Sequence, residues 1–581
     1  MNTPNQVPSI HDSFNARTLT TTALCDSFIV NDHFPKLAGP NHSIMIGPRG
    51  SGKTTLMKML QVEALDYWNG IESEEYRKSV SFSGVFIPTD RLWKQQYANL
   101  TTQVRDVNNN ARHILNAIFL LHVLERFTRV LEYRTNRNVE SFHGFRTCEI
   151  SKNDESELCK ELANAWSVIP SILSLKSLKL AISDRKVRLS TQVGKQEESP
   201  DTETAYLPDL VPALEHAINI ANTFLNEPNG KWCFLFDELE LAPESLVQPL
   251  IDSIRGGPEN IIFKLSLSPY HGDIKILETI ESPMERQDFS LIDLSQVDAR
   301  RGEKFANALC DQIFSRRGYE ENIEKYLEEP EKFNTKETFE FLSKKDPSFS
   351  HYLKEQRINL EKIDFYKEKE KRTIIRKIQF VAYLRNFFLN DHGGLRSVRR
   401  APDYYAGFSR LCRAMEYNPR MLIGMTNSFI DFLNEGNTII PVQTQIKILE
   451  DSLRSFKALL NTIPTESKKF ATVYSIVDHL GKYASKKYIK GPRFYAEPIS
   501  LFQIDGNENK SLIEAVGYGL NAGAFVREPL KKDLTHTESD NLKIRFRLSY
   551  IFAHEYGLLM TSSRHMKFPD PNVDQEQFTL L

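Results

Sequence analysis

The sequence holds one stretch whose residue types and spacing suit phosphate chemistry, GPRGSGKT at Gly47–Thr54. It fits the pattern GxxxxGK[ST], in which glycines let backbone N–H groups point inward at phosphate oxygens and the lysine reaches the β and γ phosphates. The hydroxyl of Thr54 can bind Mg²⁺. We therefore predict a site for ATP and Mg²⁺, with a glycine-rich turn that binds nothing as the alternative. The residues expected to bind the nucleotide here are Gly47, Pro48, Arg49, Gly50, Ser51, Gly52, Lys53, Thr54 and Thr55.

Two adjacent carboxylates, Asp237 and Glu238, form a second pattern with chemical meaning, because they follow the apolar run 232–236. We expect this run to be a buried strand beside the strand of the phosphate loop. Asp237 would then hold Mg²⁺ through its water shell, and Glu238 would polarise the attacking water. A plain exit from a strand into a loop is the alternative, which the phosphate loop disfavours because each motif predicts the other.

These motifs need particular elements to position them. The β-prone run 42–46 precedes the phosphate loop, and residues 54–60 can propagate a helix whose N-terminus faces the phosphates. Further strands are predicted at 81–88, 260–268 and 288–294. The alternation of strands and helices predicts an α/β fold whose core is a parallel sheet with helices on both faces.

The two motifs lie far apart in the chain. From Lys53 to Asp237 is 184 residues (237 − 53), more than a minimal nucleotide-binding core needs. The excess is predicted to be helical, since residues 110–134 are long and apolar on one face. We therefore expect an inserted helical subdomain at about 91–207. Within it, the polar stretch 185–204 is predicted to be a mobile loop.

A third feature carries a family resemblance. The helix start Asn418-Pro419-Arg420, behind GPRGSGKT and FLFDE, resembles the sensor-2 element of AAA+ ATPases of the origin-recognition initiator clade. The chain is similar in particular to bacterial ATPases grouped with that clade, which share an NARTL lead-in, a GPRGSGKTTLxKML loop and an RLSY-type C-terminal segment. The resemblance implies a P-loop AAA+ core, a helical lid and assembly into a ring or filament. It also implies that Arg420 contacts the γ-phosphate and couples the lid angle to the nucleotide state.

The resemblance suggests roles for further positions. Ser268, at the end of a predicted strand, is the best candidate for the residue that senses the γ-phosphate. Arg286 lies just before the last predicted strand, where initiator-type AAA+ proteins place an arginine finger, and Arg255 competes for that role. Asn15 and Arg17, in the lead-in, could touch the base, although an ordinary capped helix start is as good an interpretation.

The last third of the chain has no catalytic motif. Helices followed by a basic hairpin fit a winged helix, and the alternating stretch with Lys543, Arg545 and Arg547 on one strand face could meet the phosphates of a nucleic acid. A winged helix that serves as a protein contact or a structural cap is the alternative. The expected domains are a lead-in at 1–41, an ATPase core at 42–297, a helical lid at 298–430 and a winged-helix-like domain at 431–581.

Composition limits the classes of protein that remain. The net charge of −2 does not by itself indicate a nucleic-acid partner. Six cysteines without a CxxC pair predict a reduced, cytoplasmic protein without a structural zinc site. No basic start precedes an apolar run, and no window reaches the roughly 18 apolar residues of a membrane helix, so we expect a protein that is neither exported nor membrane-spanning.

Together these features predict an ATP-hydrolysing AAA+ switch whose catalytic residues are Lys53, Glu238, Arg286 and Arg420. ATP turnover would drive the assembly of a homo-oligomer on a nucleic acid, bound through the C-terminal domain, or on a partner protein. The alternative is an ATP-gated regulator of a bacterial antiphage defence system, which oligomerises and recruits or controls a separate effector protein. Glu238 argues against a module that only binds nucleotide.

Overall fold

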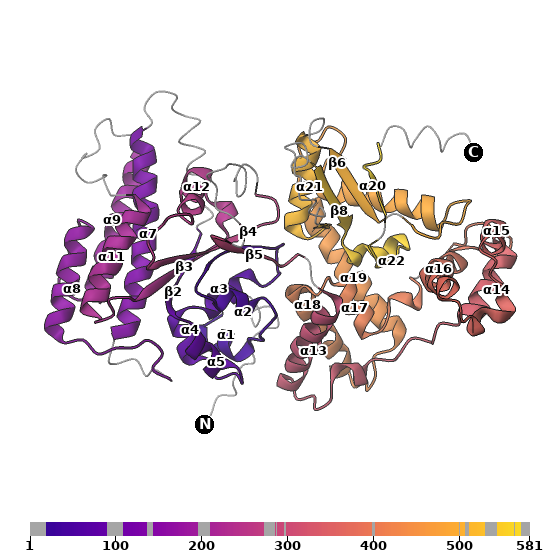
Figure 1. Ribbon diagram of the computed structural model, residues 1–581, viewed down its shortest axis with the longest axis horizontal. Helices are drawn as coiled ribbons and strands as arrows, with labels where there is room; N and C mark the ends of the chain where they lie inside the picture. The colour runs from indigo at the N-terminus through magenta and orange to yellow at the C-terminus, as the bar shows by residue number, and fades with distance from the viewer. Residues whose placement is uncertain are drawn as a thin grey trace. The chain divides into compact units, whose positions relative to one another are not determined.

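The computed structural model describes residues 19–89, 109–135, 143–195, 209–271, 285, 287–295, 298–397, 401–498, 500–505, 510–528, 543–562 and 564–570. The chain divides into two compact units, of which the first comprises residues 1–47 and 52–294 and the second residues 48–51 and 295–581. Figure 1 shows their elements coloured along the chain. The expected boundaries between core, lid and C-terminal domain stay a prediction. Among the helices of the described residues, none combines the length and apolar character that a membrane span requires.

The first unit contains a sheet and the helices around it. Its strands are β1 (His42–Ile46), β2 (Phe82–Pro88), β3 (Lys231–Asp237), β4 (Ile261–Leu267) and β5 (Phe289–Asp293). Its helices are α1 (Thr21–Ser27), α2 (Phe34–Ala38), α3 (Lys53–Met59), α4 (Val62–Tyr67), α5 (Ser73–Ser79), α7 (Asn109–Thr135), α8 (Lys152–Ala165), α9 (Leu175–Lys195), α11 (Leu210–Phe224), the 3₁₀ turn η1 (Leu239–Leu241) and α12 (Glu244–Asp252).

The sheet is parallel and has the order β2-β3-β4-β1-β5. Alternate residues of a strand enter different hydrophobic clusters: Phe234 and Phe236 pack with the insertion helices, whereas Cys233 and Leu235 pack with α1–α5. Both faces are therefore covered by helices, as the apolar strands of a parallel sheet require. The predicted α/β fold with helices on both faces is confirmed.

One detail of the predicted sheet is wrong. The acidic strand β3 does not lie beside the phosphate-loop strand β1, because β4 pairs with both of them in parallel. After β3 the chain passes through α12 and returns as β4, which fills the position between the two motif strands. Helix α3 nevertheless packs against β3, so the ends of the two motifs still meet.

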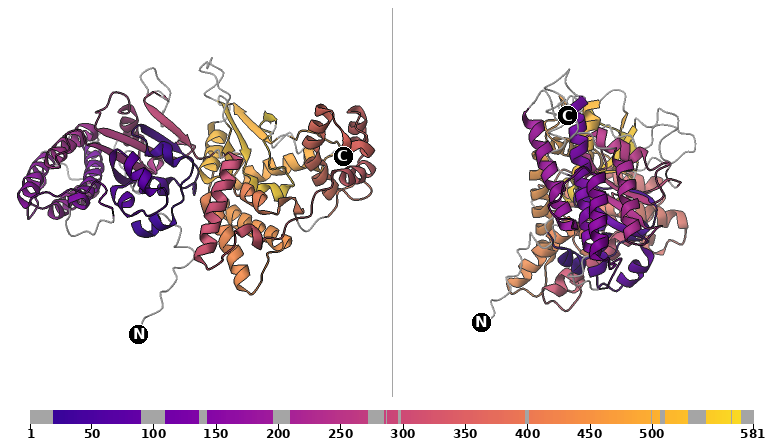
Figure 2. Two further views of the ribbon diagram at one scale, coloured as in Figure 1. Left: turned by 60° about the horizontal axis from the view of Figure 1, so that its bottom comes forward. Right: turned by 90° about the vertical axis from the view of Figure 1, so that its left-hand side faces the viewer.

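The insertion forms a helical layer. Helix α7 packs along α9, and α8 along α11, and the right-hand view of Figure 2 shows these long helices running beside one another. The predicted long helix at 110–134 corresponds to α7. The predicted mobile loop at 185–204 is wrong for its first part, because α9 continues to Lys195. Arg185 is buried there and donates to the carbonyls of Trp166 and Ser167, so tertiary contacts outweigh the polar composition.

The second unit begins with helices and ends with a small sheet. Its helices and helical turns are α13 (Ala299–Arg316), η2 (Ile323–Tyr326), α14 (Thr335–Lys345), α15 (Pro347–Glu355), η3 (Leu360–Phe365), α16 (Lys369–Phe388), η4 (Asp403–Tyr405), α17 (Phe408–Ala414), α18 (Pro419–Asn434), α19 (Val442–Asn461), α20 (Val473–Ala484), η5 (Ser485–Ile489), α21 (Lys510–Ala522), η7 (Tyr550–Phe552) and α22 (Ala553–Tyr556). Its strands are β6 (Leu501–Asp505), β7 (Phe525–Arg527), β8 (Lys543–Leu548) and β9 (His565–Lys567).

The small sheet has the order β7-β8-β6-β9 and is mixed, with β8 antiparallel to both β6 and β7 and β9 parallel to β6. The succession of α20, β6, α21 and the paired strands β7 and β8 follows the helix–strand–helix–hairpin order of a winged helix. The predicted basic strand exists as β8. Its Arg547 is not an exposed phosphate ligand, however, because it is buried and paired with both carboxylate oxygens of Glu416 at 2.6 and 2.9 Å.

Candidate nucleotide site

The phosphate loop has the backbone that its glycines allow. Gly50 and Gly52 have φ values of 84° and 92°, in the left-handed region that favours glycine, and Gly52 is the N-cap of α3. The N–H of Gly47 donates to the carbonyl of Leu267 at 3.2 Å, which ties the start of the loop to the end of β4. The loop therefore connects a central strand to a helix N-terminus, where phosphate is favoured. Of the other predicted ligands, Thr55 lies in the first turn of α3, and residues 48–51 group with the second unit.

Lys53 is the first residue of α3 and is buried. Its Nζ donates to the carbonyl oxygen of Gly47, across the loop. Burial lowers the pKa of Lys53, and the nearby carboxylates Glu240 and Asp237 oppose that shift. The ammonium group thus lies at the phosphate loop among acids at the end of β3.

Thr54 and Asp237, the two expected magnesium ligands, lie in contact, and their role stays a prediction. The Thr54 hydroxyl donates to Asp237 Oδ2 at 2.6 Å, although 183 residues separate the two in the sequence. Thr89, at the end of β2, donates from its hydroxyl to the backbone carbonyl of Asp237 at 2.6 Å and so holds the end of β3 in place. Asp237 Oδ1 is buried without a hydrogen-bond partner among the described residues. A carboxylate oxygen left in this way next to a hydroxyl suits Mg²⁺, which prefers oxygen ligands.

Glu238 follows directly and has a φ of 57°, in the left-handed region that non-glycine residues rarely adopt. This turn sets the direction in which the chain leaves β3. Its side chain lines a cavity that Thr54 and Asp237 also line. The predicted pair of carboxylates therefore lies beside Thr54, near the N-terminus of α3.

Glu240 belongs to this site, although the sequence reasoning assigned it no role. Its Oε1 accepts a hydrogen bond from the hydroxyl of Ser268 at 2.5 Å, and its charge acts on Lys53. Ser268, the predicted γ-phosphate sensor, is thus positioned by Glu240 just after β4. The acidic spacing of Asp237, Glu238 and Glu240 was the available signal, but only the return of the chain as β4 brings Ser268 to Glu240.

Arg420 lies in the second unit, in the first turn of α18. Asn418 caps this helix by accepting from the N–H of Arg420 at 3.0 Å, and Pro419 is at the first helical position, where its missing N–H is harmless. The predicted helix start is therefore confirmed, while the role of Arg420 stays a prediction. Asn15, Arg17 and Arg286 lie outside the described residues.

The fold and the site define a class of protein. A parallel sheet with one strand between β1 and β3, a phosphate loop after β1 and adjacent acids after β3 are the arrangement of AAA+ P-loop proteins. A model of the ORC-CDC6-like family matches residues 9–568, so the chain belongs to the ORC-CDC6-like family, whose members are typically AAA+ ATPases. The resemblance to the origin-recognition initiator clade is thereby confirmed. No curated protein and no solved structure matches the chain.

Proposed function

We propose that this protein binds Mg·ATP at the phosphate loop and hydrolyses it. The observation that carries the proposal is the hydrogen bond of 2.6 Å between Thr54 and Asp237, which brings the two expected magnesium ligands together at the N-terminus of α3. Membership of the ORC-CDC6-like family supports the binding of nucleotide.

Each residue of the site has a separate role in this proposal. Lys53 and the loop N–H groups bind the phosphates, which would replace the contact of Lys53 with the Gly47 carbonyl. Thr54 and Asp237 hold Mg²⁺, which when bound neutralises charge on the β and γ phosphates. Glu238 accepts the proton of the attacking water, and Ser268, positioned by Glu240, senses the γ-phosphate.

We further propose that the nucleotide state controls assembly. Arg286 of one subunit would reach the γ-phosphate of a neighbour, and Arg420 would couple the lid to the bound nucleotide. The assembled form would act on a nucleic acid or on a partner protein. The family provides the basis for this step.

The test is the molecular mass in solution, measured by light scattering without nucleotide and with Mg·ATP. Wild type, Glu238→Gln and Glu238→Gln/Arg286→Ala are compared, with phosphate release as the second readout. We expect Glu238→Gln to retain nucleotide, to lose turnover and to form a defined oligomer that Arg286→Ala abolishes. The matched control is Glu244→Gln, at the start of α12 beyond the acidic turn.

Two outcomes would contradict parts of the proposal. If wild type neither binds nor hydrolyses ATP, the assigned centre is not functional. If ATP is hydrolysed but the mass never responds to it, turnover acts within one subunit and the assembly step is wrong. Slow turnover with strong ATP-dependent assembly would favour the ATP-gated regulator.

A further inference from the structure

A cavity of about 860 Å³ lies in the first unit beside the magnesium end of the phosphate loop. Thr54, Asp237 and Glu238 line one side of it, whereas no residue from Gly47 to Lys53 does. The cavity therefore begins where the predicted nucleotide site ends. Its size is within the range that holds a nucleotide-sized ligand, roughly 300–1,000 Å³.

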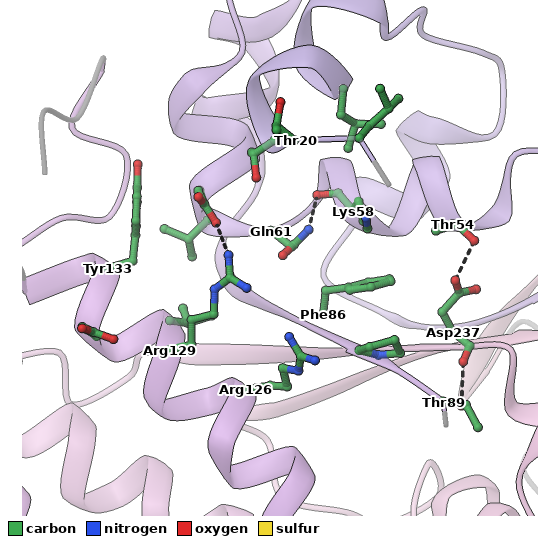
Figure 3. A pocket seen from close by; sticks show the side chains of 18 of the residues that line it. Thr20, Thr54, Lys58, Gln61, Phe86, Thr89, Arg126, Arg129, Tyr133 and Asp237 are labelled. Atoms are coloured by element: carbon green, nitrogen blue, oxygen red, sulfur yellow. Dashed lines mark hydrogen bonds and ion pairs between the residues drawn. The ribbon is translucent and has the colours of Figure 1, made fainter. Parts of the chain in front are cut away.

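The opposite wall of the cavity comes from the insertion. Arg126 and Arg129 belong to α7, and Figure 3 shows both projecting from that helix towards the side where Phe86 and Gln61 lie. Lys179 of α9 also lines the wall. The inserted helices thus enclose a space against the phosphate-loop helix and the ends of β2 and β3.

Two of the cations in this wall pair with acids that also line the cavity. Arg129 pairs with Glu63 at 3.4 Å, and Lys179 with Glu132 at 2.5 Å. Arg126 is different, because its Nε is buried and has no hydrogen-bond partner among the described residues. Burial lowers the pKa of Arg126, and the nearby charge of Glu125 opposes that shift.

Arg126 is partly buried as a residue, but its buried Nε has no acceptor among the described residues, and a buried polar group is costly unless an anion or hydrogen-bond acceptor pairs with it. Lys58, on α3, adds a second positive charge, and its Nζ lies 5.7 Å from the centroid of the Phe86 ring. The acids Asp237 and Glu238 line the same cavity beside Thr54. Positive charge beside an aromatic surface suits a ligand with an anionic group and a flat organic part.

We propose that this cavity is a second ligand site, which binds a phosphorylated mononucleotide distinct from the ATP of the phosphate loop. Its phosphate pairs with Arg126 and Lys58, and its base packs against Phe86. Because Thr54 and Asp237 form part of the same cavity, the ligand lies next to the magnesium ligands and alters the ATPase centre when it binds. The insertion then has a function, since it supplies the wall that makes the site.

The experiment measures binding of radiolabelled AMP, GMP, CMP and UMP by equilibrium dialysis, in the Lys53→Ala background. That substitution removes the lysine of the phosphate loop and no residue of the cavity, so a failure of ATP hydrolysis leaves the test intact. Lys53→Ala/Arg126→Gln is compared with the matched control Lys53→Ala/Arg188→Gln, in which the substituted arginine is exposed on α9.

We expect at least one of the four mononucleotides to bind to Lys53→Ala, with one molecule per chain. Arg126→Gln should raise the dissociation constant by about tenfold or more, because it removes a charge-assisted contact. Arg188→Gln should leave binding unchanged, and Arg126→Lys should recover part of it. The thermal unfolding midpoint shows that each variant is folded. Absence of binding at millimolar mononucleotide, or equal binding with Arg126→Gln, would overturn the proposal.

Discussion

The two sheets of this protein place their charged side chains differently. In the parallel sheet, two predicted site residues lie where strands end, since Asp237 is the last residue of β3 and Ser268 follows β4. In the mixed sheet, Arg545 and Arg547 lie inside β8, and the buried Arg547 pairs with Glu416 and Glu528. Charge at strand ends is available to a ligand, whereas charge inside a strand has to be neutralised by the protein itself.

The parallel sheet contains one buried cation that tests this contrast. Lys264 lies within β4 and is fully buried, and its Nζ donates to the backbone carbonyls of Gly39 and Asn41 at 3.0 Å each. Arg547 instead has the carboxylate of Glu416. Two carbonyl dipoles stabilise a buried cation less than a carboxylate does. The pKa of Lys264 is therefore lowered by burial, to about 8. For Arg547 burial acts in the same direction, but Glu416 outweighs it and the pKa is raised.

The largest effect is expected at the end of β3. Asp237→Asn removes the negative charge of a predicted magnesium ligand and should lower the rate of ATP hydrolysis by about 100-fold or more. Phosphate release at saturating Mg·ATP measures the rate. Asp252→Asn, at an exposed position in α12, is the control and should leave the rate unchanged. Equal rates for Asp237→Asn and wild type would show that strand-end charge in the parallel sheet is structural.

In the mixed sheet the largest effect should be on stability. Glu416→Gln leaves the buried guanidinium of Arg547 without its main anion and should lower the free energy of unfolding by about 3 kcal/mol. Thermal and denaturant unfolding measure it, with the exposed Glu435→Gln as the matched control. A loss no larger than that of the control would mean that Arg547 finds another partner, for which Glu528 at 3.6 Å is the candidate.

Lys264 predicts a pH dependence of stability. Its pKa is about 8 in the folded chain against an ordinary value of 10.5, so between these two values the unfolded state binds more protons. The free energy of unfolding of wild type should therefore rise from pH 8 to pH 10.5, by a few kcal/mol. Lys264→Met should lack this rise, while the exposed Lys78→Met should keep it. Identical pH profiles for Lys264→Met and wild type would contradict the shifted pKa.

The smallest change in stability is expected for a substitution of Arg545, a residue of β8 that is only partly buried. Its Nε donates to Gln503 Oε1 at 2.8 Å, on the neighbouring strand. Arg545→Ala should change the free energy of unfolding by less than about 1 kcal/mol, since it removes one hydrogen bond at a partly exposed position. If the C-terminal unit meets nucleic acid through this strand, the same variant should also flatten the salt dependence of binding in a filter-binding assay.

Part of the fold and site could be predicted because it depends on neighbours in the sequence. The glycines of the phosphate loop adopt backbone angles that other residues avoid, and Lys53 and Thr54 follow them directly into a helix. The apolar runs predicted the strands, and Asn418 with Pro419 predicted the start of α18. These signals are local, because each depends on residues that lie close together in the sequence.

The remainder depended on which distant segments meet. The polar stretch 185–195 is helical, and its Arg185 donates hydrogen bonds to two backbone carbonyls of a distant segment. Arg547 can be buried because it pairs with the carboxylate of Glu416. Glu240 meets Ser268 because the chain returns as β4, and Arg126 lines the cavity because α7 packs on β2 and α4. The motifs and most of the helices and strands are encoded locally, because backbone preference and hydrophobic period act over a few residues. Which buried charges are paired inside the protein, and that Arg126 lines a cavity, follows from contacts between segments far apart in the chain, which no local pattern in the sequence reveals.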